Sequence, residues 1–305
     1  MKTDKRLEML VERARAGRRL KVAVAWPADK STLNAVAQAV DNGIIDAIMI
    51  GCADKVKETM QKAIEDGRVT LLDVESPAEA AQKAVEVVRQ GDAQLLMKGL
   101  VSTDVVLRAV LNKETGLLDP GNVLTHISIG DIPTYNKLLC FGDVAVMPSP
   151  NLTQREAQLR YMLDMCRSLG IEEPRVSLIH CSEHVDARHF PCTVDYVELV
   201  KRAKEGEFGP CIVDGPLDVK TSCCLEAAVT KGIDSPLQGQ ADALIFPEIE
   251  SGNSFYKTVT LFAGATIACV VLGARVPLVV SSRGDDEMTK YYSIAAACCA
   301  AKKGA

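Results

Sequence analysis

Apolar and polar residues follow two alternating periods along most of the chain. Short apolar runs such as 44–50 predict buried strands, and runs with apolar residues three and four positions apart, such as 54–65, predict amphipathic helices. Glycines close many of these helices, and Ser76 followed by Pro77 opens one of them. Strands and helices therefore alternate, which predicts mostly parallel sheets flanked by helices on both faces.

The same pattern places each expected element. Strands are expected at 21–26, 44–50, 69–74, 93–97, 176–180, 210–213, 243–246, 267–272 and 276–280. Helices are expected at 4–16, 31–40, 54–65, 78–90, 154–168, 193–204, 220–231, 254–262 and 286–300. Between 113 and 150 the alternation gives way to two apolar runs, 122–129 and 137–147, whose separation by a polar turn favours an antiparallel pair.

Residues 148–153 contain two prolines, a serine and an asparagine and form the strongest linker signal in the chain. A length of 305 residues also exceeds what a single hydrophobic core usually holds. We therefore expect two α/β domains, the first ending at 148 and the second beginning at 149.

Composition narrows the class of protein. With 48% apolar and 25% charged residues the chain is an ordinary globular protein, and a net charge of −5 argues against sequence-independent binding of nucleic acid. No stretch reaches the ~20 apolar residues of a membrane span, and the charged N-terminus lacks a signal sequence. Eleven scattered cysteines without CxxC spacing are typical of a reducing compartment. We expect a cytoplasmic protein that binds neither membranes nor nucleic acid.

Polar segments follow four of the predicted strands. They contain Lys98, Gly99, Ser102, Thr103 and Arg108 after the first, Asp214 after the second, Gly252, Asn253 and Lys257 after the third, and Ser281, Ser282, Arg283 and Gly284 after the fourth. In parallel sheets, ligands bind outside the carboxyl ends of the strands. We therefore expect the four segments to converge on one anionic ligand, although each alone is also typical of a solvated turn.

The segment after 276–280 is the one around which this interpretation is built. Its two hydroxyls and one guanidinium precede a helix that begins with Asp285, Asp286 and Glu287. Hydroxyls, a guanidinium and the N–H groups of a helix start together suit an anion. The alternative is an N-capped helix with an exposed arginine.

Several other chemistries are disfavoured. His180, His184 and His189 cluster near Cys181 and Cys192, but their spacing fits no standard ligand set, so no metal is expected. His126 alternates within an apolar run and is interpreted as a core residue rather than a base. The chain lacks GxxxxGK[ST], GxGxxG, HExxH and GxSxG motifs, which argues against nucleotide kinases, ordinary nicotinamide enzymes and serine hydrolases.

Four ordered segments resemble the phosphate acetyl/butyryltransferase family. They are the eleven-residue run from Lys98 to Arg108, Val213-Asp-Gly-Pro, the run from Gln240 to Asn253, and Ser282-Arg-Gly. The similarity extends over essentially the whole chain, and its length and Met-Lys-Gly-Leu-Val-Ser-Thr segment resemble the butyryl branch more than the acetyl branch.

This resemblance implies an acyltransferase that moves a short-chain acyl group, butyryl in the first place, between coenzyme A and orthophosphate to give an acyl phosphate. It implies an isocitrate/isopropylmalate dehydrogenase-like fold with the active site in the interdomain cleft. Coenzyme A is then a substrate, no cofactor is permanently bound, and the protein is a homo-oligomer. The last helix returns to the first domain, which gives domains of 1–148 plus 284–305 and of 149–283.

The resemblance also implies roles for single residues. Arg283 holds the phosphoryl oxygens, and Ser282 donates to the oxygen that gains charge in the tetrahedral intermediate. Relatives of the acetyl branch have an acid about six positions after the arginine, where this chain has Thr289, so Asp285 or Asp286 takes the part of the base. Contacts to phosphate or coenzyme A are expected from Lys98, Gly99, Ser102, Thr103, Arg108, Asp214, Gly252, Asn253 and Lys257.

Alternatives stay open at this point. The acyl group is acetyl or propionyl in one of them, because a single methylene gives little discrimination. Another is a metal-dependent 2-hydroxy-acid dehydrogenase on the shared fold, for which convergent aspartates and a nicotinamide loop are not found. A third is a non-catalytic protein that binds acyl-CoA or phosphate, favoured by Thr289. A covalent route through Cys223 or Cys224 requires a helix start that lowers their pKa.

Overall fold

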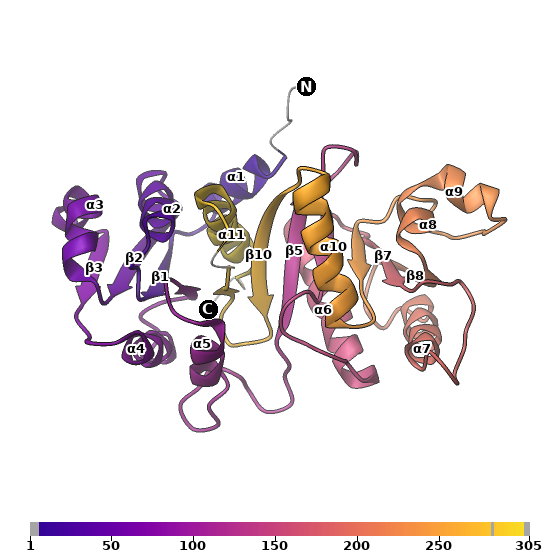
Figure 1. Ribbon diagram of the computed structural model, residues 1–305, viewed down its shortest axis with the longest axis horizontal. Coiled ribbons are helices and arrows are strands. Elements are labelled where there is room, and N and C mark those ends of the chain that lie inside the picture. Colours follow the sequence, from indigo (N-terminus) through magenta and orange to yellow (C-terminus); the bar gives the residue numbers. More distant parts are fainter. Residues whose placement is uncertain (1–5, 282–283, 302–305) are drawn as a thin grey trace. The chain divides into compact units, whose positions relative to one another are not determined.

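The structure is a computed structural model that describes residues 6–281 and 284–301 (Figure 1). The chain divides into two compact units, each with its own strands and helices. Unit 1 is formed by Thr125–Thr266 together with Arg6, and unit 2 by Leu7–Leu124 together with the chain from Ile267 onward. The mixed α/β class with helices flanking the sheets is as predicted. Over the described residues, no helix combines the length and the apolar character needed to cross a membrane.

Unit 2 contains the first part of the chain and its end. Its helices are α1 (Glu8–Ala16), α2 (Lys30–Asp41), α3 (Ala53–Glu65), α4 (Pro77–Arg89), α5 (Thr103–Val110) and α11 (Glu287–Ala300). Its strands are β1 (Leu20–Ala25), β2 (Ile45–Ile50), β3 (Val69–Leu72), β4 (Leu95–Lys98), β10 (Thr266–Leu272) and β11 (Leu278–Val279). They lie in the order β3-β2-β1-β4-β11-β10, and every neighbouring pair is parallel except β10 and β11.

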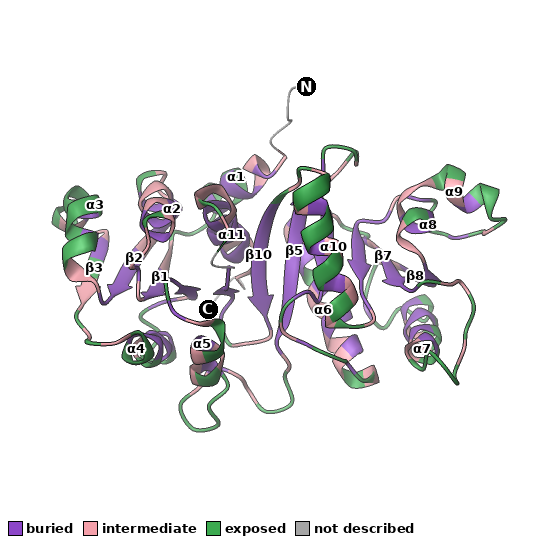
Figure 2. Cartoon of the chain, in the orientation of Figure 1, coloured by how far each residue is buried: buried purple, intermediate pink, exposed green. Residues whose placement is uncertain are grey.

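The helices of unit 2 cover both faces of this sheet, with α2, α3 and α11 on one face and α4 and α5 on the other (Figure 1). Apart from the edge strand β3, the strands are mostly buried, as expected for a parallel sheet covered twice (Figure 2). Side chains cap two of the helices that start at the carboxyl edge. Asp29 accepts from the backbone N–H of Thr32 and caps α2, and Ser102 accepts from that of Val105 and caps α5.

Unit 1 contains the middle of the chain. Its helices are α6 (Leu152–Ser168), α7 (Cys192–Lys204), α8 (Val219–Cys223), α9 (Leu225–Thr230) and α10 (Ile249–Phe262). Its strands are β5 (Thr125–Asp131), β6 (Leu139–Gly142), β7 (Arg175–Ile179), β8 (Ile212–Leu217) and β9 (Ala243–Ile245). The order is β5-β6-β9-β7-β8; β5 runs antiparallel to β6, as predicted for the two runs between 113 and 150, and the remaining pairs are parallel.

Strand β6 shows how unit 1 is layered. Phe141 packs edge-on against Phe255 of α10, with ring centroids 5.1 Å apart. A Cβ on the next residue, Gly142, would instead lie 3.6 Å from Met162 of α6. Because successive Cβ atoms point to opposite faces of a strand, α10 and α6 cover opposite faces of the sheet.

The loop after β6 is organised by one buried carboxylate. Asp143 is 2% exposed, and its Oδ2 accepts from the backbone N–H of His126 and from the Thr125 hydroxyl (2.8 and 3.1 Å). Its Oδ1 accepts from the backbone N–H groups of Ala145 and Val146 (2.7 and 2.8 Å). Four donors on one carboxylate hold the start of β5 and the turn after β6 together.

Three predicted elements differ in detail from those observed. Strand β8 continues to Leu217, so that Asp214 and the following Gly-Pro lie within the strand rather than after it. The helix expected at 220–231 is divided into α8 and α9, because Cys224 has extended backbone angles (φ −143°, ψ 112°). Helix α10 begins at Ile249, so Gly252 and Asn253 lie in its first turns and not in a turn that precedes it.

The units change over at 124 and 266, whereas the linker signal and the resemblance led us to expect domains of 1–148 plus 284–305 and of 149–283. Strand pairing is the reason for the difference. Strand β6 pairs with β5 and with β9, which joins 125–148 to unit 1, and β11 pairs with β4, which joins 267–281 to unit 2. The expected division stays a prediction for the domains as folding units.

Candidate functional site

Two strand ends lie side by side at one edge of unit 2. Strand β11 pairs with β4 in parallel, with Leu278 opposite Leu96 and Val279 opposite Met97. The chain therefore leaves both strands at the same edge, through Lys98 on one side and Ser281 on the other. Ser281 is 3% exposed, and its hydroxyl has no hydrogen-bond partner in the part of the chain that the structure describes. Ser282 and Arg283, the next two residues, lie outside the described residues.

The turn after β4 is rigidly held. Lys98 is 3% exposed, and its Nζ donates to the carbonyl oxygens of Gly99 and Val101 (3.2 and 3.3 Å). The backbone N–H of Gly99 donates to the carbonyl of Ala25 at the end of β1 (2.9 Å). A Cβ at Gly99 would lie 2.4 Å from the carbonyl oxygen of Trp26, so only glycine permits this close approach. The turn is thus preorganised beside the end of β1.

The other predicted contacts of this segment lie on α5. Ser102 is its N-cap and Thr103 its first residue, which is exposed. Arg108 lies in its last turn, where it pairs with Asp104 (2.6 Å) and is largely exposed. The Arg108 side chain lines a groove of about 1270 Å³ between α4 and α5, to which Lys83 and Arg89 also contribute.

The start of α11 contains the two predicted acids. Asp286 is the N-cap, and its Oδ1 accepts from the backbone N–H of Thr289 (2.7 Å). One oxygen of this carboxylate is therefore used to stabilise the helix start. Asp285 precedes the cap and is half-buried. Thr289, where the resemblance to the acetyl branch led us to expect an acid, lies in the first turn of the helix.

A buried ion pair that no sequence pattern predicts lies at the same edge. Lys290 of α11 is 4% exposed and donates to Asp29 Oδ1 (3.0 Å) and to the Ser31 hydroxyl; Asp29 is the N-cap of α2 and Ser31 lies in its first turn. Asp29 followed by Ser31 and Thr32 is a readable helix-start signal. Nothing in the sequence indicates, however, that a lysine on the last helix is buried against it.

The four remaining predicted residues belong to unit 1. Asp214 lies in β8 and accepts from the Ser235 hydroxyl (2.6 Å). Gly252 brings α10 against the loop after β6, since a Cβ there would lie 2.1 Å from the carbonyl oxygen of Asp143. Asn253 Nδ2 donates to the carbonyl of Val144 (2.9 Å), and the exposed Lys257 ammonium lies over the Tyr256 ring. The structure thus brings Gly252 and Asn253 together as the contact of α10 with this loop.

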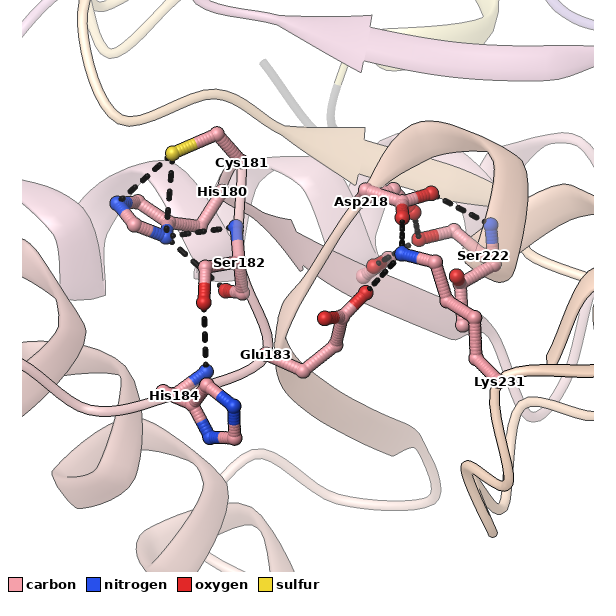
Figure 3. Close-up of polar contacts among 10 residues, drawn as sticks. His180, Cys181, Ser182, Glu183, His184, Asp218, Ser222 and Lys231 are labelled. Carbon is pink, nitrogen blue, oxygen red and sulfur yellow. Dashed lines mark hydrogen bonds and ion pairs between the residues drawn. The ribbon is translucent and has the colours of Figure 1, made fainter.

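A second polar cluster follows β7 and β8 of unit 1 (Figure 3). Lys231 binds Glu183 (2.6 Å) and Asp218, which joins the loop after β7 to the cap of α8. Across the described ranges, no three His, Cys, Asp or Glu side chains are arranged to hold a metal ion. Burial alone would raise the pKa of Asp218, but hydrogen bonds from Lys231 and Thr221 lower that pKa to about 2.

We expect Asp218→Asn to lower the free energy of unfolding at neutral pH. The ordinary pKa of the carboxyl is 3.8 and the folded value is about 2, so the charged form stabilises the fold above pH 3.8. The difference between wild type and variant should shrink as the pH falls from 3.8 towards 2. Urea titrations at several pH values measure it, and a difference independent of pH would show that the charge of Asp218 contributes nothing.

The cysteine route is not supported by the position of Cys223. This residue is the last of α8 and not the first of a helix, and burial raises the pKa of its thiol to about 11. The expectation of a lowered pKa is therefore wrong for Cys223, which is protonated at neutral pH.

Comparison with known proteins shows that the segments with predicted site residues all lie within one family match. The model of the phosphate acetyl/butaryl transferase family matches residues 74–298, about three quarters of the chain. The chain belongs to the phosphate acetyl/butaryl transferase family. As a member of this family it is a phosphate acyltransferase. The matched range contains every predicted site residue, whereas Asp29 and Ser31 precede it.

Relatives from both branches of the phosphate acetyl/butaryl transferase family are similar to the chain. Phosphate butyryltransferase of Clostridium acetobutylicum is 36% identical over 91% of this chain and 92% of its own. Phosphate acetyltransferase of Thermotoga maritima is 34% identical over 95% of this chain and 97% of its own. These relatives support membership of the family. Their names differ in the acyl group, butyryl in one and acetyl in the other, although the two are nearly equally similar to this chain.

Solved structures agree on the fold. A branched-chain phosphotransacylase from Enterococcus faecalis superposes with a TM-score of 0.78 at 25% identity, over 92% of this chain and 99% of its own. A 4-hydroxythreonine-4-phosphate dehydrogenase from Burkholderia phymatum has a TM-score of 0.54 at 14% identity, over 94% and 100% of the two chains. The second likeness concerns the fold alone, and it fits the predicted dehydrogenase-like architecture.

Proposed function

We propose that this phosphate acyltransferase moves a butyryl group between coenzyme A and orthophosphate. The single observation that supports the proposed site best is the parallel pairing of β4 with β11, which places Lys98 and Ser281 at one edge of unit 2. The butyryl preference is supported by the segment from Met97 to Thr103 and by the Clostridium acetobutylicum relative named phosphate butyryltransferase.

In the direction of thioester synthesis, the sulfur of coenzyme A attacks the acyl carbon of the acyl phosphate. A carbon–sulfur bond forms, the bond from that carbon to the phosphate oxygen breaks, and orthophosphate leaves. Arg283 holds the phosphoryl oxygens with its planar fork, and the Ser282 hydroxyl donates to the carbonyl oxygen as it gains charge. Lys98 and Gly99 shape the wall of this pocket on the side of β4.

The thiol proton needs an acceptor, since a free thiol has a pKa of about 8.5. Of the two predicted acids we assign the base to Asp285, which precedes the cap of α11 and is half-buried. We propose that Ser102, Thr103 and Arg108 contact the phosphate or the pantetheine arm of coenzyme A. Further contacts to phosphate or coenzyme A are proposed for Asp214, Gly252, Asn253 and Lys257. We further propose a cytoplasmic homo-oligomer without a permanently bound cofactor.

The acyl preference is tested by incubating the protein with coenzyme A and acetyl, propionyl or butyryl phosphate and following thioester absorbance. We expect the highest kcat/KM with butyryl phosphate, because each methylene that fills an apolar pocket contributes about 1–3 kcal/mol, or roughly 10- to 200-fold. A higher kcat/KM with acetyl or propionyl phosphate would replace the butyryl assignment. No thioester from any of the three would leave a protein that binds acyl-CoA or phosphate without turnover.

A further inference from the structure

The buried Lys290 joins α11 to the turn after β1. Its Nζ donates to Asp29 Oδ1 (3.0 Å) and to the Ser31 hydroxyl, and the side chain is 5% exposed. Burial alone would raise the pKa of Asp29, but hydrogen bonds from Ser31, Thr32 and Lys290 hold it well below its usual range. Asp29 is therefore ionised at neutral pH, and the contact is a charged pair.

A second contact joins the same two elements. Asn34 Nδ2 of α2 donates to Glu287 Oε2 at the first residue of α11 (2.8 Å). The amino-terminal turns of α2 and α11 are thus held together at two points, both close to the strand ends. Further along the same helices, Asn42 Nδ2 donates to the hydroxyl of Tyr291 (2.8 Å).

The turn after β1 is in turn bonded to the turn after β4. The backbone N–H groups of Gly99 and Leu100 donate to the carbonyls of Ala25 and Trp26 (2.9 and 2.8 Å). The turn that contains Lys98 and the start of α11 are therefore both fixed to the same short segment, 25–31. Segment 25–31 therefore fixes the Lys98 turn and the start of α11, which form the two sides of the proposed phosphate pocket, relative to each other.

The chemistry of position 290 is unusual for its surroundings. The following residues of α11, from Tyr291 to Ala297, are all buried. An apolar side chain at 290 would be expected to pack there at no cost in desolvation, whereas a buried ion pair often stabilises a fold no better than apolar residues. We therefore attribute the lysine at this position to the fixed geometry that its ion pair imposes on the two elements, rather than to added stability.

We propose that Lys290 is a positioning residue for phosphoryl recognition, which fixes the start of α11 against the turn after β1 and so holds the start of α11 and the Lys98 turn in a fixed relative position. This inference rests on the proposed function, because it concerns the same pocket. Lys290 itself acts through Asp29 and Ser31 and is not a catalytic residue.

Three variants separate positioning from stability. Lys290→Met leaves the carboxylate of Asp29 without its partner, so both the melting temperature and kcat should fall. In the double variant Asp29→Asn/Lys290→Met neither charge remains, so the melting temperature should recover much of the loss. We expect kcat of the double variant to stay about 10- to 100-fold below wild type, since small displacements of reacting groups have effects of this size.

Tyr291→Phe is the matched control, because it removes a hydrogen bond between the same two helices at a point farther along both. It should leave kcat within about twofold of wild type. In the double variant, the KM for orthophosphate in the reverse reaction should rise more than the KM for acyl-CoA. A double variant that regains wild-type kcat together with its melting temperature would overturn the proposal and make Lys290 a purely structural residue.

A second measurement does not depend on turnover. Inorganic phosphate should raise the melting temperature of wild type and of Tyr291→Phe, and this shift should be lost in the double variant. If wild type forms no thioester but the shift is lost as expected, the proposed function fails and the positioning role stands. An unchanged shift in the double variant would overturn the positioning role whatever the turnover.

Discussion

Replacing Arg283 by alanine is expected to lower kcat by about 10²–10³-fold, in the range found for the loss of one group that stabilises developing charge. In the proposed site this guanidinium holds two phosphoryl oxygens at once while the bond to the acyl carbon breaks. Water cannot replace the fork, because its donors are not held in place. Steady-state rates with coenzyme A and the preferred acyl phosphate measure the effect.

Two further arginine variants make the result specific. Arg283→Lys should regain less than about tenfold, since an ammonium is a point charge and cannot form the bidentate contact. Arg275→Ala is the matched control: Arg275 lies between β10 and β11, is half exposed and pairs with Asp119 (2.9 Å). It should retain wild-type rates. A near-normal kcat in Arg283→Ala would refute our assignment of the phosphoryl contact to Arg283.

Replacing Asp143 by alanine is expected to lower the free energy of unfolding by about 3–5 kcal/mol, the range for removing one member of a buried charged network. The change leaves three backbone N–H groups and one hydroxyl without their acceptor in a buried loop. The loop also receives Asn253 and accommodates Gly252, so the start of α10 should loosen with it. Urea unfolding monitored by circular dichroism measures the loss.

Asp186→Ala is the control for this prediction. Asp186 also accepts from backbone N–H groups of its own loop, those of Arg188 and His189, but it is solvent-exposed in the region of its carboxylate. Water can take its place there, so a much smaller loss of stability is expected. Equal losses in the two variants would show that burial of Asp143 contributes nothing beyond ordinary loop capping.

Local patterns were sufficient to predict most elements of the fold. The period of apolar residues placed β2 and α3 within one residue of their observed bounds at each end. It also identified the antiparallel pair of β5 and β6, because two apolar runs joined by a short turn have few other ways to pair. These features depend on neighbours in sequence, which the pattern of side chains reports directly.

Non-local pairing was not predictable in this way. The placement of β11 between β4 and β10 decides which unit the end of the chain joins, and no local pattern encodes it. Asp214 was expected after its strand, but β8 shifts its register on β7 between Ser177 and Ile179 and runs on to Leu217. A shift of register depends on the partner strand, which the segment itself does not specify.

The candidate site was also predictable only in part, because local patterns show strand ends but not the contacts between distant segments. Residues at or just after strand ends, such as Lys98 and Ser281, were found because strand ends are visible in the sequence. Lys290 was missed because a lysine within a helical pattern is ordinarily solvated, and only the fold shows what covers it. Ser102 and Asp286 were found, but their hydroxyl and carboxylate also cap helices, a use that the motif alone does not reveal.

The interruption of unit 2 by residues 125–266 of unit 1 has a consequence for the nascent polypeptide. When the ribosome has made the chain as far as Leu124, β4 has β1 on one side and nothing on the other, because β11 is translated only after the intervening 125–266. Unit 1 can fold as it emerges, while an open strand edge waits for its partner. Until β11 is translated, the unpaired edge of β4 can associate with other unfinished chains or bind a chaperone, and both processes compete with correct folding.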